Sequence, residues 1–199
     1  MDPNVVSGII GLVGALAGAL LGGYYTRGVA RQSFENQMAQ QRAEQERIIA
    51  GVLQALYEEL GALWEVYMRE VGQKLEELAE NQIFGYTVPL TQQDYFTIFN
   101  NNSAYIGHIP DPELRQLIVR TYMRAKGVLD SLRMHNQLND DFEQVQRLAL
   151  NAPFAYGNLL KYTNKLKENH CDTKALVETT MAKIETRLGT LNLLKSDLL

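Results

Sequence analysis

The sequence predicts an all-α protein in which a single N-terminal transmembrane helix is followed by a cytoplasmic helical bundle. The segment Val5–Tyr25 has no charged residue, and apolar residues recur at steps of three and four from Ile49 onward. No segment alternates apolar and polar residues as a half-buried strand would. We therefore expect a transmembrane helix in 1–26, a polar juxtamembrane helix or stalk in 27–48 and the bundle in 49–199.

Composition excludes several classes of function. The chain has 199 residues, of which 46% are hydrophobic, which suits one domain with an appendage. Its formal net charge of −4 argues against direct nucleic-acid binding. The single cysteine, Cys171, has no internal partner for a disulfide, as is usual in a reducing compartment. Without a spaced Cys/His cluster we expect neither a metal nor another cofactor.

The segment Val5–Tyr25 has the length and flanks of a membrane anchor. At about 1.5 Å rise per residue, such a helix spans about 31 Å, the thickness of a bilayer core. A cleaved signal peptide is the alternative, but the chain starts Met-Asp-Pro-Asn without a positive charge. Arg27 and Arg31 follow the span, which places the N-terminus outside and the rest in the cytoplasm of a bacterial cell. Tyr24 and Tyr25 stand where interfacial aromatic residues gather.

Glycines of this segment gather on one side of the predicted helix. At 100° per residue, the small residues occupy an arc of about 140°, with Ala17 as the main exception outside it. The small arc consists of Ser7, Gly8, Gly11, Gly14, Ala15, Gly18, Ala19 and Gly22. Small residues permit the close backbone approach on which helix association in a bilayer depends.

A glycine face of this kind predicts a partner helix. The chain has no second candidate span, so the partner is expected to be another molecule, most simply another copy. If the small faces of two helices pack against each other, they form a twofold dimer. If the small face of one helix packs against the bulky face of its neighbour, the contacts close a ring. The lumen of such a ring would have no charged lining and would gate by wetting and dewetting. An alanine- and glycine-rich anchor without a specific partner remains the alternative.

Local signals place the helices that follow. One helix is expected to run to about Glu80, and its apolar stripe Ile49–Leu78 would pack into the chain's own core or between neighbouring stalks. Thr91–Asp94 resembles a capping box before a short helix that ends near Phe99. Asn100–Ser103 is expected to bend the chain.

Asp111-Pro112-Glu113 has the composition of a helix start, with an aspartate cap, a proline in the first turn and an acid. We expect this helix to end near Leu138 and a later one to end near Asn169. Asn139–Asp141 is expected to start that later helix, which Pro153 kinks or restarts, and Asp172 is expected to cap the last helix. The soluble part is thus predicted to be a bundle of four to five helices.

Charged residues are unevenly distributed along the bundle. Glu58–Glu80 holds seven glutamates, whereas Arg115–Arg133 holds five basic residues. The second segment could present a basic face to RNA or a nucleotide. Alternatively, it packs beside the acidic segment or is solvated, which the acidic balance of the whole chain favours. The three histidines, His108, His135 and His170, lack metal-ligand spacing and are interpreted as structural, with His170 at a helix end.

One constellation resembles a known catalytic signature. Arg133-Met134-His135 matches the start of the HEPN ribonuclease signature, in which a histidine follows after three further residues. Asn139 occupies that position here. A carboxamide does not exchange a proton near neutral pH as an imidazole does, so we expect no ribonuclease activity.

The architecture as a whole resembles the membrane accessory proteins of type VI-B CRISPR systems, which combine an N-terminal span with a divergent HEPN-like domain. The resemblance implies an oligomeric pore in the inner membrane that strengthens antiphage defence by an RNA-guided ribonuclease. Two rival hypotheses are a membrane-tethered scaffold for a cytoplasmic protein and a tethered ribonuclease that uses Arg133 and His135.

Overall fold

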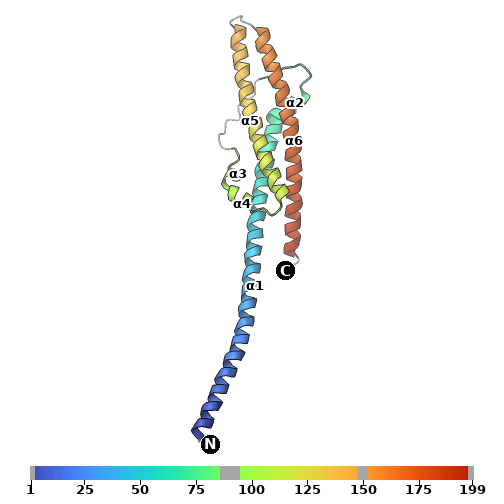
Figure 1. Cartoon of the computed structure of the whole chain (residues 1–199). Coiled ribbons are helices and arrows are strands. Elements are labelled where there is room, and N and C mark those ends of the chain that lie inside the picture. Colours follow the sequence, from blue (N-terminus) through green and yellow to red (C-terminus); the bar gives the residue numbers. More distant parts are fainter. Residues whose placement is uncertain (1–2, 86–94, 148–151, 197–199) are drawn as a thin grey trace. The chain divides into compact units, whose positions relative to one another are not determined.

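The computed structural model describes the backbone of residues 3–85, 95–147 and 152–196. Within these ranges it describes all side chains except those of residues 3–13, 15–26, 28, 152 and 192–196. Every regular element of the described residues is a helix, which confirms the all-α prediction (Figure 1). The chain divides into two compact units, Met1–Ile48 and Ile49–Leu199.

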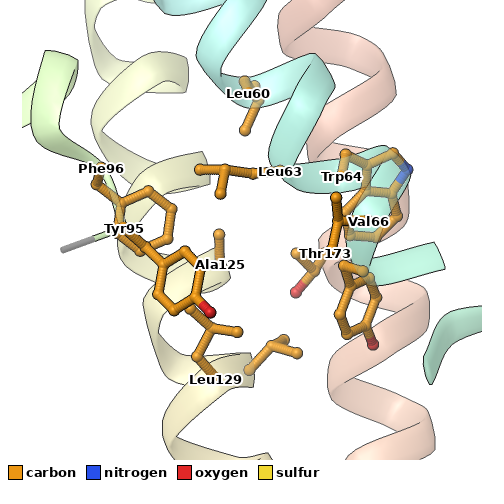
Figure 2. Close-up of a pocket in the computed structure, with 11 residues that line it drawn as sticks. Leu60, Leu63, Trp64, Val66, Tyr95, Phe96, Ala125, Leu129 and Thr173 are labelled. Atoms are coloured by element: carbon orange, nitrogen blue, oxygen red, sulfur yellow. The ribbon is translucent and has the colours of Figure 1, made fainter. Parts of the chain in front are cut away.

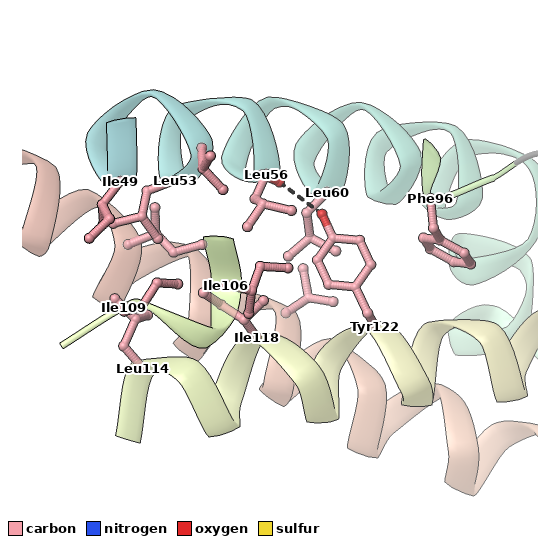
Figure 3. Packing of buried hydrophobic residues seen from close by; sticks show 13 residues of the cluster. Ile49, Leu53, Leu56, Leu60, Phe96, Ile106, Ile109, Leu114, Ile118 and Tyr122 are labelled. Carbon is pink, nitrogen blue, oxygen red and sulfur yellow. Dashed lines mark hydrogen bonds between the residues drawn. The ribbon is translucent and has the colours of Figure 1, made fainter. Parts of the chain in front are cut away.

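The elements follow one another without a strand in the described residues. They are α1 (Pro3–Tyr67), the π-helix η1 (Met68–Gly72), α2 (Gln73–Glu77), α3 (Thr97–Asn101), α4 (Ser103–Gly107), α5 (Pro112–Arg147) and α6 (Ala152–Ser196). In the second unit α5 and α6 lie side by side, and the C-terminal part of α1 packs against both (Figures 1 and 3).

The helix of the first unit exposes its described side chains. Every described side chain from Arg27 to Ile48 is exposed, including Phe34, which is 63% exposed. Arg31 Nε lies 2.9 Å from Glu35 Oε1 one turn later, and both side chains are well solvated. Such an exposed pair stabilises a helix by only about 0.3–0.5 kcal/mol. Since helices in proteins draw most of their stability from packing, this segment receives little from its described side chains.

The stripe that begins at Ile49 forms the main core of the second unit. Ile49, Leu53, Leu56 and Leu60 are at most 4% exposed and lie on one face of α1. They pack against apolar residues of α4, α5 and α6, as Figure 3 shows. Tyr122 of α5 joins this core and donates its hydroxyl hydrogen toward the Leu56 carbonyl oxygen, 3.1 Å away. The burial confirms that the stripe belongs to the chain's own core.

A second cluster continues the core beyond α1. Tyr67, Val71 and Leu75 continue the predicted stripe and are at most 5% exposed. The helix widens into η1 within this stretch and ends with α2 at Glu77, close to the expected end near Glu80. Val71 lies within η1 and is 1% exposed, so the buried face continues through the π-helix.

The segment before α5 differs from the prediction. The expected bend at Asn100–Ser103 is confined to Asn102, because α3 includes Asn101 and α4 begins at Ser103. Phe96 precedes α3 with a φ of 73°, a conformation rare for a residue with a side chain. The predicted capping box Thr91–Asp94 lies outside the described residues.

The predicted start of α5 is confirmed, but its predicted end is wrong. Asp111 Oδ1 accepts hydrogen bonds from the backbone N–H groups of Glu113 (2.9 Å) and Leu114 (3.1 Å). The helix then continues through Asn139 to Arg147. Asn139 does not cap a new helix, because its side-chain amide donates to the His135 carbonyl oxygen one turn earlier.

α6 is a single helix of 45 residues, so the predicted break near Asn169 and the cap at Asp172 are both wrong. Asp172 instead pairs with Arg124 of α5 at 3.3 Å. Buried positions recur at steps of three and four straight through this region. They are Leu159, Thr163, Leu166, His170, Thr173, Val177, Thr180 and Ile184. Continuous packing against α5 therefore outweighs the local capping signal, and two predicted helices merge into one.

Candidate functional site

The HEPN-like residues do not form one site. Arg133 is exposed and pairs with Asp130 Oδ1 at 2.9 Å, one turn earlier on α5. His135 is fully buried. Residues two apart on a helix point about 200° apart, which explains this separation. Asn139, at the position of the second histidine, hydrogen-bonds within its own helix.

His135 of α5 forms a hydrogen bond with Phe84, which lies in the irregular segment after α2. Its Nε2 lies 2.7 Å from the Phe84 carbonyl oxygen, and the Phe84 N–H donates to Thr163 Oγ1 at 3.3 Å. A carbonyl only accepts, so Nε2 carries the hydrogen and Nδ1 is the unprotonated nitrogen of the neutral ring. That Nδ1 is buried without a partner among the described residues. Burial lowers the pKa of His135, and the hydrogen bond to Phe84 partly offsets this effect.

We predict a pH-dependent stability that comes from His135. Because its pKa is lowered in the folded state, the unfolded state binds more protons below about pH 6.5. The contribution of neutral His135 to the free energy of unfolding should therefore be fully present above that pH. It should fall as the pH drops toward 5, by at most about 1.4 kcal/mol per pH unit. His135→Gln keeps a donor but does not titrate. Urea unfolding at pH 7 and pH 5 should show a smaller difference in this variant, and an equal difference would contradict the prediction.

A chain of hydrogen bonds runs from the surface to a buried hydroxyl in the second unit. Lys174 Nζ lies 2.7 Å from Glu76 Oε1, and His170 Nε2 lies 3.1 Å from the same oxygen. The other ring nitrogen, Nδ1, lies 2.9 Å from the Tyr67 hydroxyl. His170 and Tyr67 are 2% and 5% exposed. The ring of Trp64 stacks on both of their rings.

The π-helix and a glycine make room for this chain. A Cβ built on Gly72 would collide with Met68 Sδ and would lie 3.1 Å from His170 Cε1. Glycine at this position therefore lets the imidazole of α6 lie directly against the backbone of η1. π-Turns within helices are frequent at functional sites.

Burial and hydrogen bonds shift the pKa values of two groups in this chain, Tyr67 and Glu76. Burial raises the pKa of Tyr67, and Cys171 and Glu76 raise it further, so the hydroxyl stays protonated. Hydrogen bonds from Lys174 and then His170 lower the pKa of Glu76. A charged Glu76 only accepts, so the neutral ring donates from Nε2 and receives the Tyr67 hydrogen at Nδ1.

Sequence analysis missed this chain. Tyr67 and Glu76 precede His170 by about a hundred positions, and no short motif joins them. The spacing of His170 and Lys174 is a usable signal, because residues four apart share one face of a helix. The expected helix end near Asn169 concealed that signal and placed His170 wrongly at a helix terminus.

Three of the five basic residues in Arg115–Arg133 have partners outside the acidic segment. Arg115 donates to the carbonyl oxygens of Gly107 (3.2 Å) and Ile109 (3.0 Å), and Arg124 pairs with Asp172. The cations that meet the acidic segment come instead from α6. Lys174 binds Glu76, and Lys167 donates to the Leu78 carbonyl oxygen at 2.6 Å.

Most residues of the predicted span lie outside the described side chains. This holds for Gly11, Gly18, Gly22, Tyr24 and Tyr25, whereas Gly14, Arg27 and Arg31 are described and exposed. Among the described residues, no helix contains a stretch both long and apolar enough to cross a membrane.

Within the ranges that the structure describes, no three His, Cys, Asp or Glu side chains are placed to hold a metal ion. No protein-family model, curated protein or solved structure matches the chain.

Proposed function

We propose that the chain is a homo-oligomeric, single-pass inner-membrane protein whose spans assemble through Gly11, Gly14, Gly18 and Gly22 and enclose a pore. The observation that carries this proposal is the gathering of glycines on one arc of the charge-free segment Val5–Tyr25. A lipid-facing helix gains nothing from such a face, whereas a neighbouring helix can approach it closely.

The surroundings of Gly14 differ from those of Gly72 and are compatible with the proposal. A Cβ built on Gly72 would meet His170 and Met68, so the chain's own packing accounts for that glycine. Gly14 is exposed, and a Cβ built on it would meet nothing within 4 Å. Alanine would also be a better helix former at that position by about 1 kcal/mol. The same open space surrounds Gly51, Gly127 and Gly157, so Gly14 leaves room for a neighbouring molecule without requiring one.

The proposed pore would act by disrupting membrane integrity during antiphage defence, alongside an RNA-guided ribonuclease. Arg27 and Arg31 favour a cytoplasmic location for the part that follows the span. Two observations support a role without catalysis: Arg133 and His135 point to different sides of α5, and Asn139 replaces the second histidine.

Ion flux through vesicles tests the proposal. Full-length protein is reconstituted into liposomes loaded with a fluorescent anion of low membrane permeability. We expect release that rises steeply with the protein-to-lipid ratio, because several copies must meet before a lumen exists. Vesicles that stay tight although protein is shown to be incorporated would overturn the pore. Recovery of the protein in the soluble fraction of lysed cells would overturn the membrane anchor as well.

A further inference from the structure

A pocket of about 190 Å³ lies in the second unit between α5 and the segment 95–100. Tyr95, Phe96 and Leu129 line both this pocket and a smaller cavity of about 40 Å³ beside Trp64, which Figure 2 shows. The smaller cavity has no room for an organic ring, since a cavity that holds benzene measures about 150 Å³. The larger pocket therefore accommodates one aromatic ring with a small substituent, and it stays below the roughly 300–1,000 Å³ of sites for larger ligands.

Aromatic rings form the apolar wall of the larger pocket. Phe99 of α3 is partly buried and stacks on Tyr122 of α5, with ring centroids 4.2 Å apart and an angle of 11° between the planes. Phe96 meets Tyr122 edge-on at 5.5 Å. Phe96 and Tyr122 are buried, and the Tyr122 hydroxyl lies 3.1 Å from the Leu56 carbonyl oxygen, so the core holds both rings in place. Fixed rings of this kind present surfaces on which a further aromatic ring packs by offset or edge contact.

The rim of the pocket carries one positive charge in excess. Lys126, Asp130 and Arg133 lie about one turn apart on one face of α5, and all three line the pocket. Asp130 and Arg133 pair with each other at 2.9 Å. Lys126 is exposed and forms no hydrogen bond or ion pair with any residue that the structure describes. Asn100 adds a side-chain amide that can donate a hydrogen bond. The pocket therefore offers an unpaired cation and an amide beside an aromatic wall.

A carboxylate outside the pocket is already satisfied by other donors. Glu59 of α1 does not line the pocket, and its oxygens accept hydrogen bonds from the N–H groups of Ile98 (2.7 Å) and Phe99 (3.1 Å). The Tyr122 hydroxyl also lies 3.1 Å from Glu59 Oε2. These donors engage the charge of Glu59, which leaves Lys126 as the unpaired charge that a ligand meets.

We propose that this pocket is a binding site for a small aromatic anion, a single ring that carries one carboxylate or similar acidic group. The ring packs against Phe99 and Tyr122, and the acidic group pairs with Lys126 and accepts a hydrogen bond from Asn100. A neutral ring lacks the ion pair, and an aliphatic acid lacks the ring contacts, so both should bind more weakly. The pocket involves none of the glycines of the proposed pore, so the two proposals stand or fail separately.

Fluorine NMR tests the proposal, with 4-fluorobenzoate as the probe, full-length protein in mild detergent as the receptor and detergent alone as the blank. Binding to a large particle raises the transverse relaxation rate of the fluorine signal. We expect a saturable rise that unlabelled benzoate reverses and that acetate at the same concentration does not. 4-Fluorobenzamide, which has nearly the same shape without the charge, should bind at least about tenfold more weakly. No rise, a rise that benzoate does not reverse, displacement by acetate or equal affinity for the amide would overturn the site.

Two variants and a matched control locate the site. Lys126→Gln removes the charge of an exposed side chain and should weaken 4-fluorobenzoate by about tenfold or more, while 4-fluorobenzamide binds as before. Phe99→Leu removes one ring from the wall and should weaken both probes. Arg120→Gln is the matched control, since it removes one positive charge from an exposed position of the same helix that does not line the pocket. No loss in Lys126→Gln, or an equal loss in Arg120→Gln, would contradict the assignment.

Discussion

Gly18→Ile is expected to dissociate the oligomer. A branched side chain in the middle of the small arc holds the neighbouring backbone away and removes the close contact on which association in a bilayer depends. The association constant should fall by about a hundredfold or more, which corresponds to about 2.7 kcal/mol. The particle mass of the full-length protein in mild detergent, determined by light scattering, measures the change.

The control for this experiment lies on the other arc of the same segment. Leu20→Ile keeps the volume of a side chain on the bulky arc of the predicted helix, so it should leave the mass of a dimer unchanged. In a ring, where bulky and small faces meet, it should weaken assembly but less than Gly18→Ile does. If the wild-type protein is a monomer, or if Gly18→Ile leaves the mass of the oligomer unchanged, the glycines do not mediate assembly. They would then only reflect the composition of a membrane anchor.

His170→Ala is expected to destabilise the second unit by about 3–5 kcal/mol. The substitution opens a cavity beside Trp64 and Gly72, and it leaves the buried Tyr67 hydroxyl without its partner. Equilibrium unfolding of the full-length protein in urea, followed by circular dichroism, measures the loss. Tyr67→Phe should cost about 1–3 kcal/mol, because it leaves only Nδ1 of the imidazole unsatisfied.

Cys171→Ala is the matched control, since this residue neighbours His170 on α6 and its side chain is exposed. Its effect should stay within about 0.5 kcal/mol, as is usual for exposed positions. A loss below 1 kcal/mol for His170→Ala would show that the hydrogen-bonded chain contributes little to the fold. A loss equal to that of Tyr67→Phe would show that the imidazole stabilises only through the tyrosine.

The two incorrect helix boundaries have the same physical origin. Asn139 and Asp172 are good capping residues, and each stands where the local sequence favours a helix start. Both lie instead within helices, because α5 and α6 bury apolar and hydroxyl side chains against each other along their length. Thr121 and Thr180, for example, share a hydrogen bond of 2.7 Å across this interface. Asp111 keeps its predicted role because Pro112 cannot continue a preceding helix and favours the first turn.

The amino-acid sequence by itself determined the helical class, the buried stripe from Ile49 to Leu75 and the cap at Asp111, because each depends on spacing within a few turns. The glycine arc likewise follows from spacing alone. Only the tertiary structure decided that His170 joins Tyr67 to Glu76, that His135 is buried against Phe84, and that a cavity opens beside Trp64. These features depend on contacts between residues far apart in the chain, and neither periodicity nor local propensity records which distant side chains will meet.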